Sequence, residues 1–132
     1  MKIPTYQLSL IVGELESVDI GSDGRVKVFA EAPLMKDAAN QFKDFPRFLE
    51  LAEEYLTPYQ WGTCNFYVMP DGYAFGGMEH INAIQLTNSM VHDSSSLFIA
   101  IHEITHSWFG NDVGCNSKIH RRCLRRGQLN LY

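Results

Sequence analysis

Two histidines and a glutamate in the second half of the chain have the types and spacing of a hydrolytic metal site. His102, Glu103 and His106 form the pattern H-E-x-x-H. On a helix the two histidines lie about one turn apart, so both imidazoles can reach one metal ion from the same face. Such nitrogen ligands suit Zn²⁺, and the glutamate can take a proton from a water molecule that the metal activates. The pattern therefore predicts a zinc metallopeptidase with His102 and His106 as ligands and Glu103 as the catalytic base.

The residues around this pattern predict the helix that it requires. Serines at 94–96 can cap its start, and Gly110 with Asn111 can end it. Apolar residues recur between these signals at helical spacing, at Leu97, Ile101, Ile104 and Trp108. We expect Trp108 to pack in the core rather than to contact a substrate. The alternative is a buried helix whose histidines are only satisfied polar groups, because a five-residue pattern can also arise by chance.

The composition is that of a globular domain. The chain has 132 residues, and its hydrophobic content of 45% is sufficient for a core. No apolar run approaches the roughly 20 residues that cross a bilayer, and the N-terminus lacks the apolar stretch of a signal peptide. We therefore expect a cytoplasmic location and no membrane partner. An odd number of cysteines without a disulfide spacing predicts free thiols, at Cys64, Cys115 and Cys123.

The charge is unevenly distributed along the chain. The net charge is −4, yet basic residues cluster near the C-terminus, at Lys118, Arg121, Arg122, Arg125 and Arg126. No acidic residue follows Asp112, so the rest of the chain is clearly acidic. An acidic body argues against nucleic acid as a partner. The basic tail alone could contact RNA or acidic lipid, but a solvated end is the more frequent outcome.

Periodicity elsewhere predicts a mixture of strands and helices, and hence an α+β fold. Alternating apolar residues predict strands at 6–12 and 25–30, on either side of a glycine-rich turn. Helical spacing predicts helices at 35–42 and 45–56. Further strands are expected at 61–69 and 81–86. The first strands are too few to bury a face alone, so they either pack on the remainder or end a larger sheet, and we favour the latter.

A second motif makes the pattern more specific. Gly76, Gly77, Met78 and Glu79 precede the H-E-x-x-H segment, and Phe109-Gly110-Asn111 follows it directly. With both motifs, the sequence resembles the M1-type zinc aminopeptidases over residues 2–115. The segments Lys2-Ile3-Pro4 and Pro58-Tyr59-Gln60-Trp61-Gly62 are most similar to the branch that contains leukotriene A4 hydrolase and aminopeptidase B.

The resemblance implies a fold and a division into domains. We expect part of a thermolysin-like zinc peptidase domain, with a mixed sheet and the H-E-x-x-H helix, preceded by the last strands of a β-rich domain. The expected boundaries are 1–32 for the end of the β domain, 33–116 for the first half of the catalytic domain and 117–132 for a divergent basic tail.

The resemblance also implies a cofactor, a substrate and residue roles. The cofactor is Zn²⁺, the substrates are peptide N-termini, and Glu79 holds the free α-amino group beside Gly76, Gly77 and Met78. A carboxylate that pairs with a terminal ammonium makes such an enzyme an exopeptidase. The intact members named above can also open a fatty-acid epoxide at the same zinc. The alternative for Glu79 is a surface acid after a turn.

Two positions depart from the family pattern. His80 stands where the family has Asn, and Arg125 stands where the family's third zinc ligand, a Glu, is expected. Two protein ligands alone would hold Zn²⁺ weakly. Other competent ligands lie nearby, but their spacing matches no known ligand pattern: Cys115, His120 and Cys123. A second hypothesis is therefore a catalytically inactive truncated fragment or pseudo-enzyme, whose tail is a truncated, misspliced or frameshifted end.

Overall fold

The described part of the chain contains two strands, two helices, three further strands and a last helix, with short 3-10 turns before the first strand and before the last helix. The structure is a computed structural model, and it describes residue 3 and residues 5–93 and 97–113. The elements in order are η1 (Thr5–Gln7), β1 (Glu16–Ile20), β2 (Val26–Ala30), α1 (Ala32–Gln41), α2 (Phe45–Tyr55), β3 (Cys64–Met69), β4 (Gly77–Met78), β5 (Ile84–Thr87), η2 (Asn88–Val91) and α3 (Leu97–Thr105). The α+β class predicted from the sequence is confirmed.

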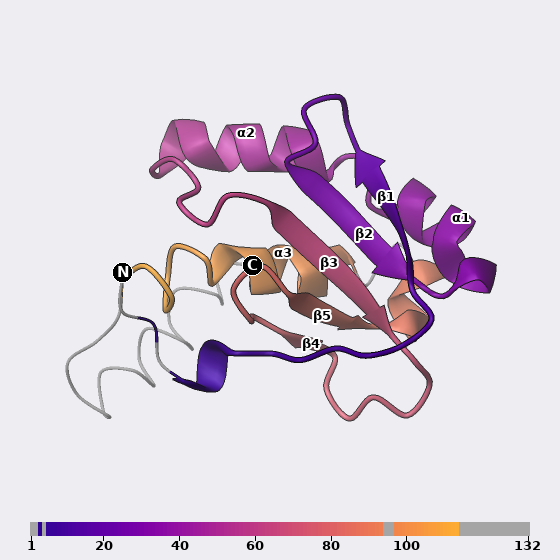
Figure 1. The fold of residues 1–132 in the computed structure, drawn as a ribbon. Helices are drawn as coiled ribbons and strands as arrows, with labels where there is room; N and C mark the ends of the chain where they lie inside the picture. Colours follow the sequence, from indigo (N-terminus) through magenta and orange to yellow (C-terminus); the bar gives the residue numbers. More distant parts are fainter. Residues whose placement is uncertain (1–2, 4, 94–96, 114–132) are drawn as a thin grey trace.

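The strands form one mixed sheet in the order β1-β2-β3-β5-β4 (Figure 1). The outer pairs, β1 with β2 and β4 with β5, are antiparallel, whereas β2, β3 and β5 run parallel. A parallel pair needs a crossover, which α1 and α2 provide between β2 and β3. Strands from both sides of the predicted boundary at residue 32 belong to this sheet, and the boundary itself stays a prediction.

The helices cover one face of the sheet, and the core lies between these layers (Figure 1). Alternate residues of the parallel strands point into this core, so that Val28, Phe66 and Ile84 stand side by side and are buried. Phe66 stacks on Phe42 with ring centroids 5.1 Å apart and meets Phe45 edge-on at 4.7 Å.

Among the described helices, none has both the length and the apolar character that a membrane span requires.

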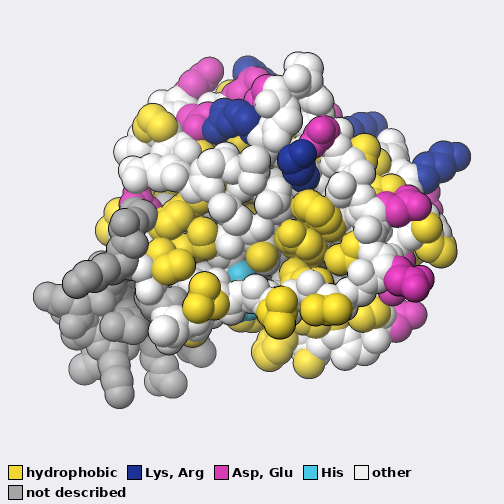
Figure 2. Space-filling view, viewed as in Figure 1, with side chains coloured by type: hydrophobic (Ala, Val, Ile, Leu, Met, Phe, Trp, Pro, Cys, Tyr) yellow, Lys and Arg dark blue, Asp and Glu magenta, His cyan; other side chains and the backbone are white. Residues whose placement is uncertain are grey.

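The opposite face of the sheet is only partly covered. Half-buried Phe29 and Tyr67 stack there with centroids 4.4 Å apart, and the N-terminal segment reaches this layer where Gln85 donates a hydrogen bond to Ser9 Oγ. Hydrophobic side chains gather across the middle of this view (Figure 2). The strand predicted for 6–12 is wrong: after η1 the backbone pairs with none of the described strands, and Leu10 and Val12 are 89% and 86% exposed.

The other predicted elements are present, with shifted ends. Helix α1 begins earlier than predicted because Pro33 fits its first turn, and α2 ends within one residue of its predicted limit. Strand β3 begins at Cys64 because Gly62 adopts a positive φ of 80° in the preceding turn. Asn82, at φ 57°, similarly delays the start of β5.

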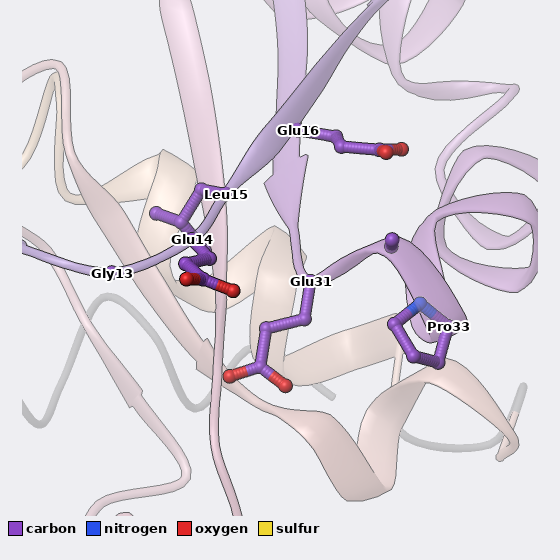
Figure 3. Close-up of a pocket in the computed structure, with 7 residues that line it drawn as sticks. Gly13, Glu14, Leu15, Glu16, Glu31 and Pro33 are labelled. Carbon is purple, nitrogen blue, oxygen red and sulfur yellow. The ribbon is translucent and has the colours of Figure 1, made fainter.

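A pocket of about 840 Å³ lies where the segment before β1 meets the start of α1 (Figure 3). Its lining contains three glutamates and none of the site residues predicted from the sequence. The lining residues are Gly13, Glu14, Leu15, Glu16, Glu31, Ala32 and Pro33. A cluster of exposed carboxylates does not by itself identify a ligand, so we assign no function to this pocket.

An ion pair joins the start of β2 to the end of α2. The Arg25 guanidinium donates two hydrogen bonds to the Glu53 carboxylate, at 2.9 and 2.7 Å, and the backbone N–H of Tyr59 donates a third at 2.7 Å. The bonds from Arg25 lower the pKa of Glu53, and burial acts in the opposite direction. A carboxyl group with a lowered pKa stabilises the fold above its unfolded-state pKa, and this contribution is lost as the pH falls through the folded-state pKa.

We expect Glu53→Gln to lower the free energy of unfolding by about 1 kcal/mol at pH 7, and by clearly less at pH 3. Urea unfolding of both proteins at the two pH values measures this difference. Glu50→Gln is the matched control, because Glu50 pairs with Arg47 at the surface with both side chains more than half exposed. An equal loss of free energy of unfolding at both pH values would contradict a stabilising role of the ionised Glu53 carboxylate.

Candidate metal centre

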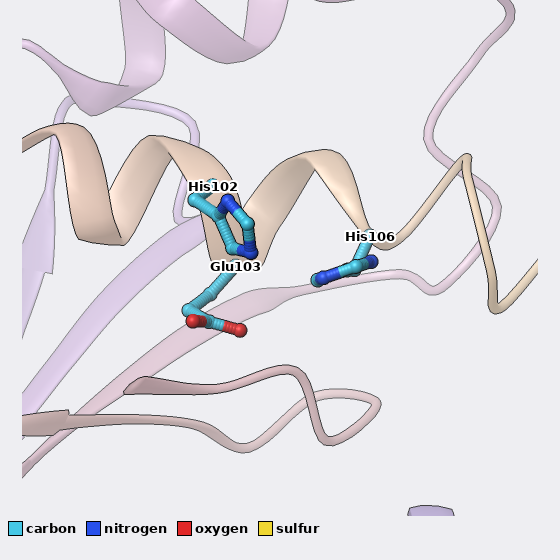
Figure 4. Close-up of side chains that lie close together, drawn as sticks. All are labelled: His102, Glu103 and His106. Carbon is cyan, nitrogen blue, oxygen red and sulfur yellow. The ribbon is translucent and has the colours of Figure 1, made fainter. Parts of the chain in front are cut away.

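The three residues of the H-E-x-x-H pattern come together in the structure. Candidate ligand atoms of His102, Glu103 and His106 all lie within 4.8 Å of one another. His102 and Glu103 are on the last turn of α3, and His106 follows it directly, with its N–H bonded to the carbonyl oxygen of His102 at 3.3 Å. Figure 4 shows the three side chains projecting from the same side of the helix. The serines predicted to cap this helix lie outside the described residues.

The helix ends earlier than the sequence suggested, at Thr105 rather than near Gly110. Helical turns nevertheless continue beyond it, since Phe109 N–H bonds to the Thr105 carbonyl oxygen at 3.1 Å. Trp108 is 5% exposed, donates from Nε1 to the Thr57 carbonyl oxygen at 2.8 Å and packs edge-on against Tyr59. The prediction that Trp108 belongs to the core is confirmed, and this contact anchors the end of the metal-site segment.

A backbone carbonyl orients His106. Its Nδ1 lies 3.0 Å from the carbonyl oxygen of Phe109, which can only accept a hydrogen bond, so Nδ1 carries the proton and Nε2 keeps a free lone pair. A second hydrogen bond of this kind commonly orients histidines that bind metal. Gly110 permits the turn, because its φ is +124° and an added Cβ would lie 3.4 Å from His106 Nδ1.

Glu103 is buried against strand β4. The side chain is 7% exposed, and burial, followed by the charge of Glu79, raises the pKa of Glu103 to about 8. A Cβ added at Gly77 would lie 2.5 Å from Glu103 Cγ and 2.7 Å from its Oε1. Only glycine therefore lets β4 pass this close to the carboxylate. The sequence placed Gly77 in a substrate-binding segment, and the structure adds that this residue packs directly on Glu103.

The electrostatics of the cluster fit a divalent cation. Burial lowers the pKa of half-buried His102, His106 lowers it further, and Glu79 opposes both. A lowered pKa favours neutral imidazole, the form that binds metal. The raised pKa of Glu103 likewise reflects a carboxylate without a compensating positive charge. Two imidazoles beside a carboxylate are a donor set suited to Zn²⁺, so the residues present fit this ion.

Glu79 lies close enough for its charge to act on Glu103 and His102. Its backbone oxygen accepts a hydrogen bond from Asn111 Nδ2 at 3.0 Å. Of its neighbours in the motif, Met78 pairs with Gln85 in the sheet, and the carbonyl oxygen of Gly76 accepts a hydrogen bond from the backbone N–H of Thr87 at 3.1 Å. The two motifs are thus adjacent in space, as the sequence reasoning required. Cys115, His120, Cys123 and Arg125, named as possible or missing ligands, lie outside the described residues.

Sequence reasoning missed three polar residues near the cluster. Tyr73 donates from its hydroxyl to Gln85 Oε1 at 2.8 Å, and burial, Glu103 and Glu79 raise its pKa. The sequence indicates Asn111 as part of a helix stop and of the F-G-N segment, but it does not predict the contact of this residue with Glu79. Gln7, 3% exposed, donates from Nε2 to Asn111 Oδ1 at 2.6 Å, and no pattern in the sequence identified it.

Comparisons with known proteins find similar chains among peptidases. Residues 41–118 match the peptidase family M1 domain. The chain is 40% identical over 113 residues to leucine aminopeptidase 2 of Kluyveromyces lactis, and 37% identical over 113 residues to aminopeptidase B of Rattus norvegicus. Each match covers 84% of this chain and 17% of the relative. A solved structure of yeast LTA4 hydrolase in complex with bestatin is similar with a TM-score of 0.70 and 38% identity, over 75% of this chain and 16% of that one.

Proposed function

Because this chain belongs to peptidase family M1, we propose that it carries the metal-binding and amine-binding part of a zinc aminopeptidase site, which removes N-terminal residues from peptides. The observation that carries the proposal is the placement of Glu79 beside the cluster of His102, Glu103 and His106. The cluster can bind a zinc ion that activates water, and the nearby Glu79 carboxylate can select a peptide with a free N-terminus. The chain spans 17% of the curated relatives named above, so the activity of a whole enzyme is part of the proposal.

In the proposed reaction, His102 and His106 hold Zn²⁺. When bound, the ion would polarise the scissile carbonyl and lower the pKa of water. Glu103 takes the proton from the attacking water and delivers it to the leaving amine. Its buried position beside Gly77 restricts the carboxylate to one place, and the bond from His106 Nδ1 to Phe109 keeps Nε2 available.

Glu79 determines where the substrate begins. A carboxylate binds a terminal ammonium by charge-assisted hydrogen bonds, so only a peptide with a free N-terminus gains this contact. Because Glu79 has a fixed position relative to the metal ligands, it limits how many residues lie between the N-terminus of the peptide and the scissile bond. We propose that Gly76, Gly77 and Met78 hold the backbone around this contact. His80, in place of the family's Asn, puts a bulkier imidazole ring next to Glu79 in the proposed amine site.

A second candidate is a chain that keeps the fold and binds metal without turnover. Its support is that Arg125 stands where the family's third zinc ligand, a Glu, is expected. Epoxide hydrolysis, a cytoplasmic location and domain limits at residues 32 and 116 are likewise proposals for this chain.

One pair of measurements separates the two candidates. We expect the purified chain to bind one zinc ion and to hydrolyse leucine p-nitroanilide but not its N-acetyl derivative, since only the former offers an ammonium to Glu79. Zinc binding without hydrolysis would favour the inactive candidate. If the chain neither binds zinc nor hydrolyses leucine p-nitroanilide, only its membership of the family would stand. Atomic absorption gives the zinc content, and release of p-nitroaniline gives the rate.

A further inference from the structure

Asn111 contacts the backbone of both motifs. Its Nδ2 donates to the carbonyl oxygen of Glu79 at 3.0 Å, and its backbone N–H donates to the carbonyl oxygen of His106 at 3.0 Å. One residue thereby joins the proposed amine-binding segment to the second metal ligand. These two segments are far apart in the sequence, so this contact directly relates their positions.

Gln7 fixes the orientation of the Asn111 amide. The carbonyl oxygen of Glu79 can only accept, so the NH₂ group of Asn111 faces Glu79 and its oxygen faces Gln7, whose Nε2 donates to Asn111 Oδ1 at 2.6 Å and holds the amide in this orientation. Gln7 is 3% exposed, so water competes little for this bond. The N-terminal segment, through η1, therefore supports the site from outside both motifs.

We propose that Asn111, oriented by Gln7, is a positioning residue that sets the place of Glu79 relative to the metal ligands and thereby the selection of a free N-terminus. This inference rests on the proposed function. Small displacements of a positioning group can cost a large part of an interaction that depends on geometry. Losing the Asn111 amide should therefore weaken recognition of the ammonium more than binding of the metal.

The loop that carries Glu79 has a matching contact at its other end. Asn65 Nδ2 donates to the carbonyl oxygen of Asn82 at 3.1 Å, just before β5. This bond has the same chemistry as the bond from Asn111, an amide donor to a loop carbonyl, but Asn65 lies on β3 rather than on the metal-site segment. Asn65→Ala is therefore the matched control for Asn111→Ala.

The test uses two chelators on the zinc-loaded chain. Leucine hydroxamate and N-acetyl-leucine hydroxamate share the zinc-binding group, and only the first carries an ammonium, so the ratio of their Kd values measures amine recognition. We expect the wild type and Asn65→Ala to prefer the free amine by at least about tenfold. Asn111→Ala should reduce this preference to below about threefold, with little change in affinity for the N-acetyl compound.

Each other outcome overturns the inference. If the wild type clearly prefers the free amine over the N-acetyl compound and Asn111→Ala keeps this preference, then Asn111 has no positioning role. The proposed function would be unaffected. Equal weakening of both compounds means that Asn111 only supports the metal site. A wild type without preference, or without zinc binding, contradicts the proposed function and the inference with it. In the metal-free chain, hydrogen exchange at residues 79–80, the end of the loop that Asn111 contacts, should be faster in Asn111→Ala than in Asn65→Ala, and equal rates would also overturn the inference.

Discussion

Replacing Glu103 with Gln is expected to lower kcat for leucine p-nitroanilide by about 10²–10⁴-fold while the zinc content stays at the wild-type value. Glutamine has nearly the same shape, so it fills the space beside Gly77, where the native side chain is buried. Its neutral amide cannot accept the proton of the attacking water. The measurements are steady-state kinetics and atomic absorption on the same preparations.

Glu54→Gln is the control for this experiment, because Glu54 is exposed on α2 and outside the cluster. Its kcat should match the wild type. A Glu103→Gln variant that keeps full activity would remove the catalytic base from the proposed mechanism. Loss of zinc together with activity would instead mean that the Glu103 carboxylate contributes mainly to metal binding.

Replacing His106 with Ala is expected to weaken zinc binding by at least about 100-fold, because even groups that only orient ligands contribute about 10–100-fold. The variant leaves His102 as the only imidazole of the cluster. It also removes the hydrogen bond to Phe109 that fixes the proton on Nδ1. Competition with a chromophoric chelator at constant pH measures the affinity directly.

His92→Ala is the matched control for this second prediction. Its ring is exposed, and its closest ionic contact, to Asp37, is 3.8 Å. Its zinc affinity should equal that of the wild type. Wild-type affinity in His106→Ala would show that the ion is held elsewhere, and the thiols and imidazole at Cys115, Cys123 and His120 would then become the ligands to test.

The parts that could be predicted from sequence depend on neighbours along the chain. His102 and His106 are four positions apart, and a helix converts that spacing into a common face without help from distant residues. The same reasoning located α2, because Pro46 favours a first helical turn and apolar residues repeat after it. The burial of Trp108 in the core could be predicted from the same helical spacing of apolar residues.

Patterns that need a distant partner were less reliable. The alternation at 6–12 matches the period of a strand, but a strand also needs another edge to pair with, and this segment has none among the described residues. Strand β1 was not separately predicted, because its place depends on its pairing with β2, where Val18 stands opposite Val28. Strand β4 is too short for any period to be visible.

Residue type and local spacing were therefore sufficient to predict that two imidazoles and an acid come together on one helix, and to associate Glu79 with a second motif. The chemistry of these groups depends on contacts that no local pattern contains. Packing of β4 against α3 buries Glu103 and raises its pKa to about 8, and it makes Gly77 sterically necessary. Asn111 and Gln7 join segments from opposite ends of the described chain. Burial and hydrogen bonding between distant segments arise only when the whole chain folds, because they depend on distances in space rather than along the sequence.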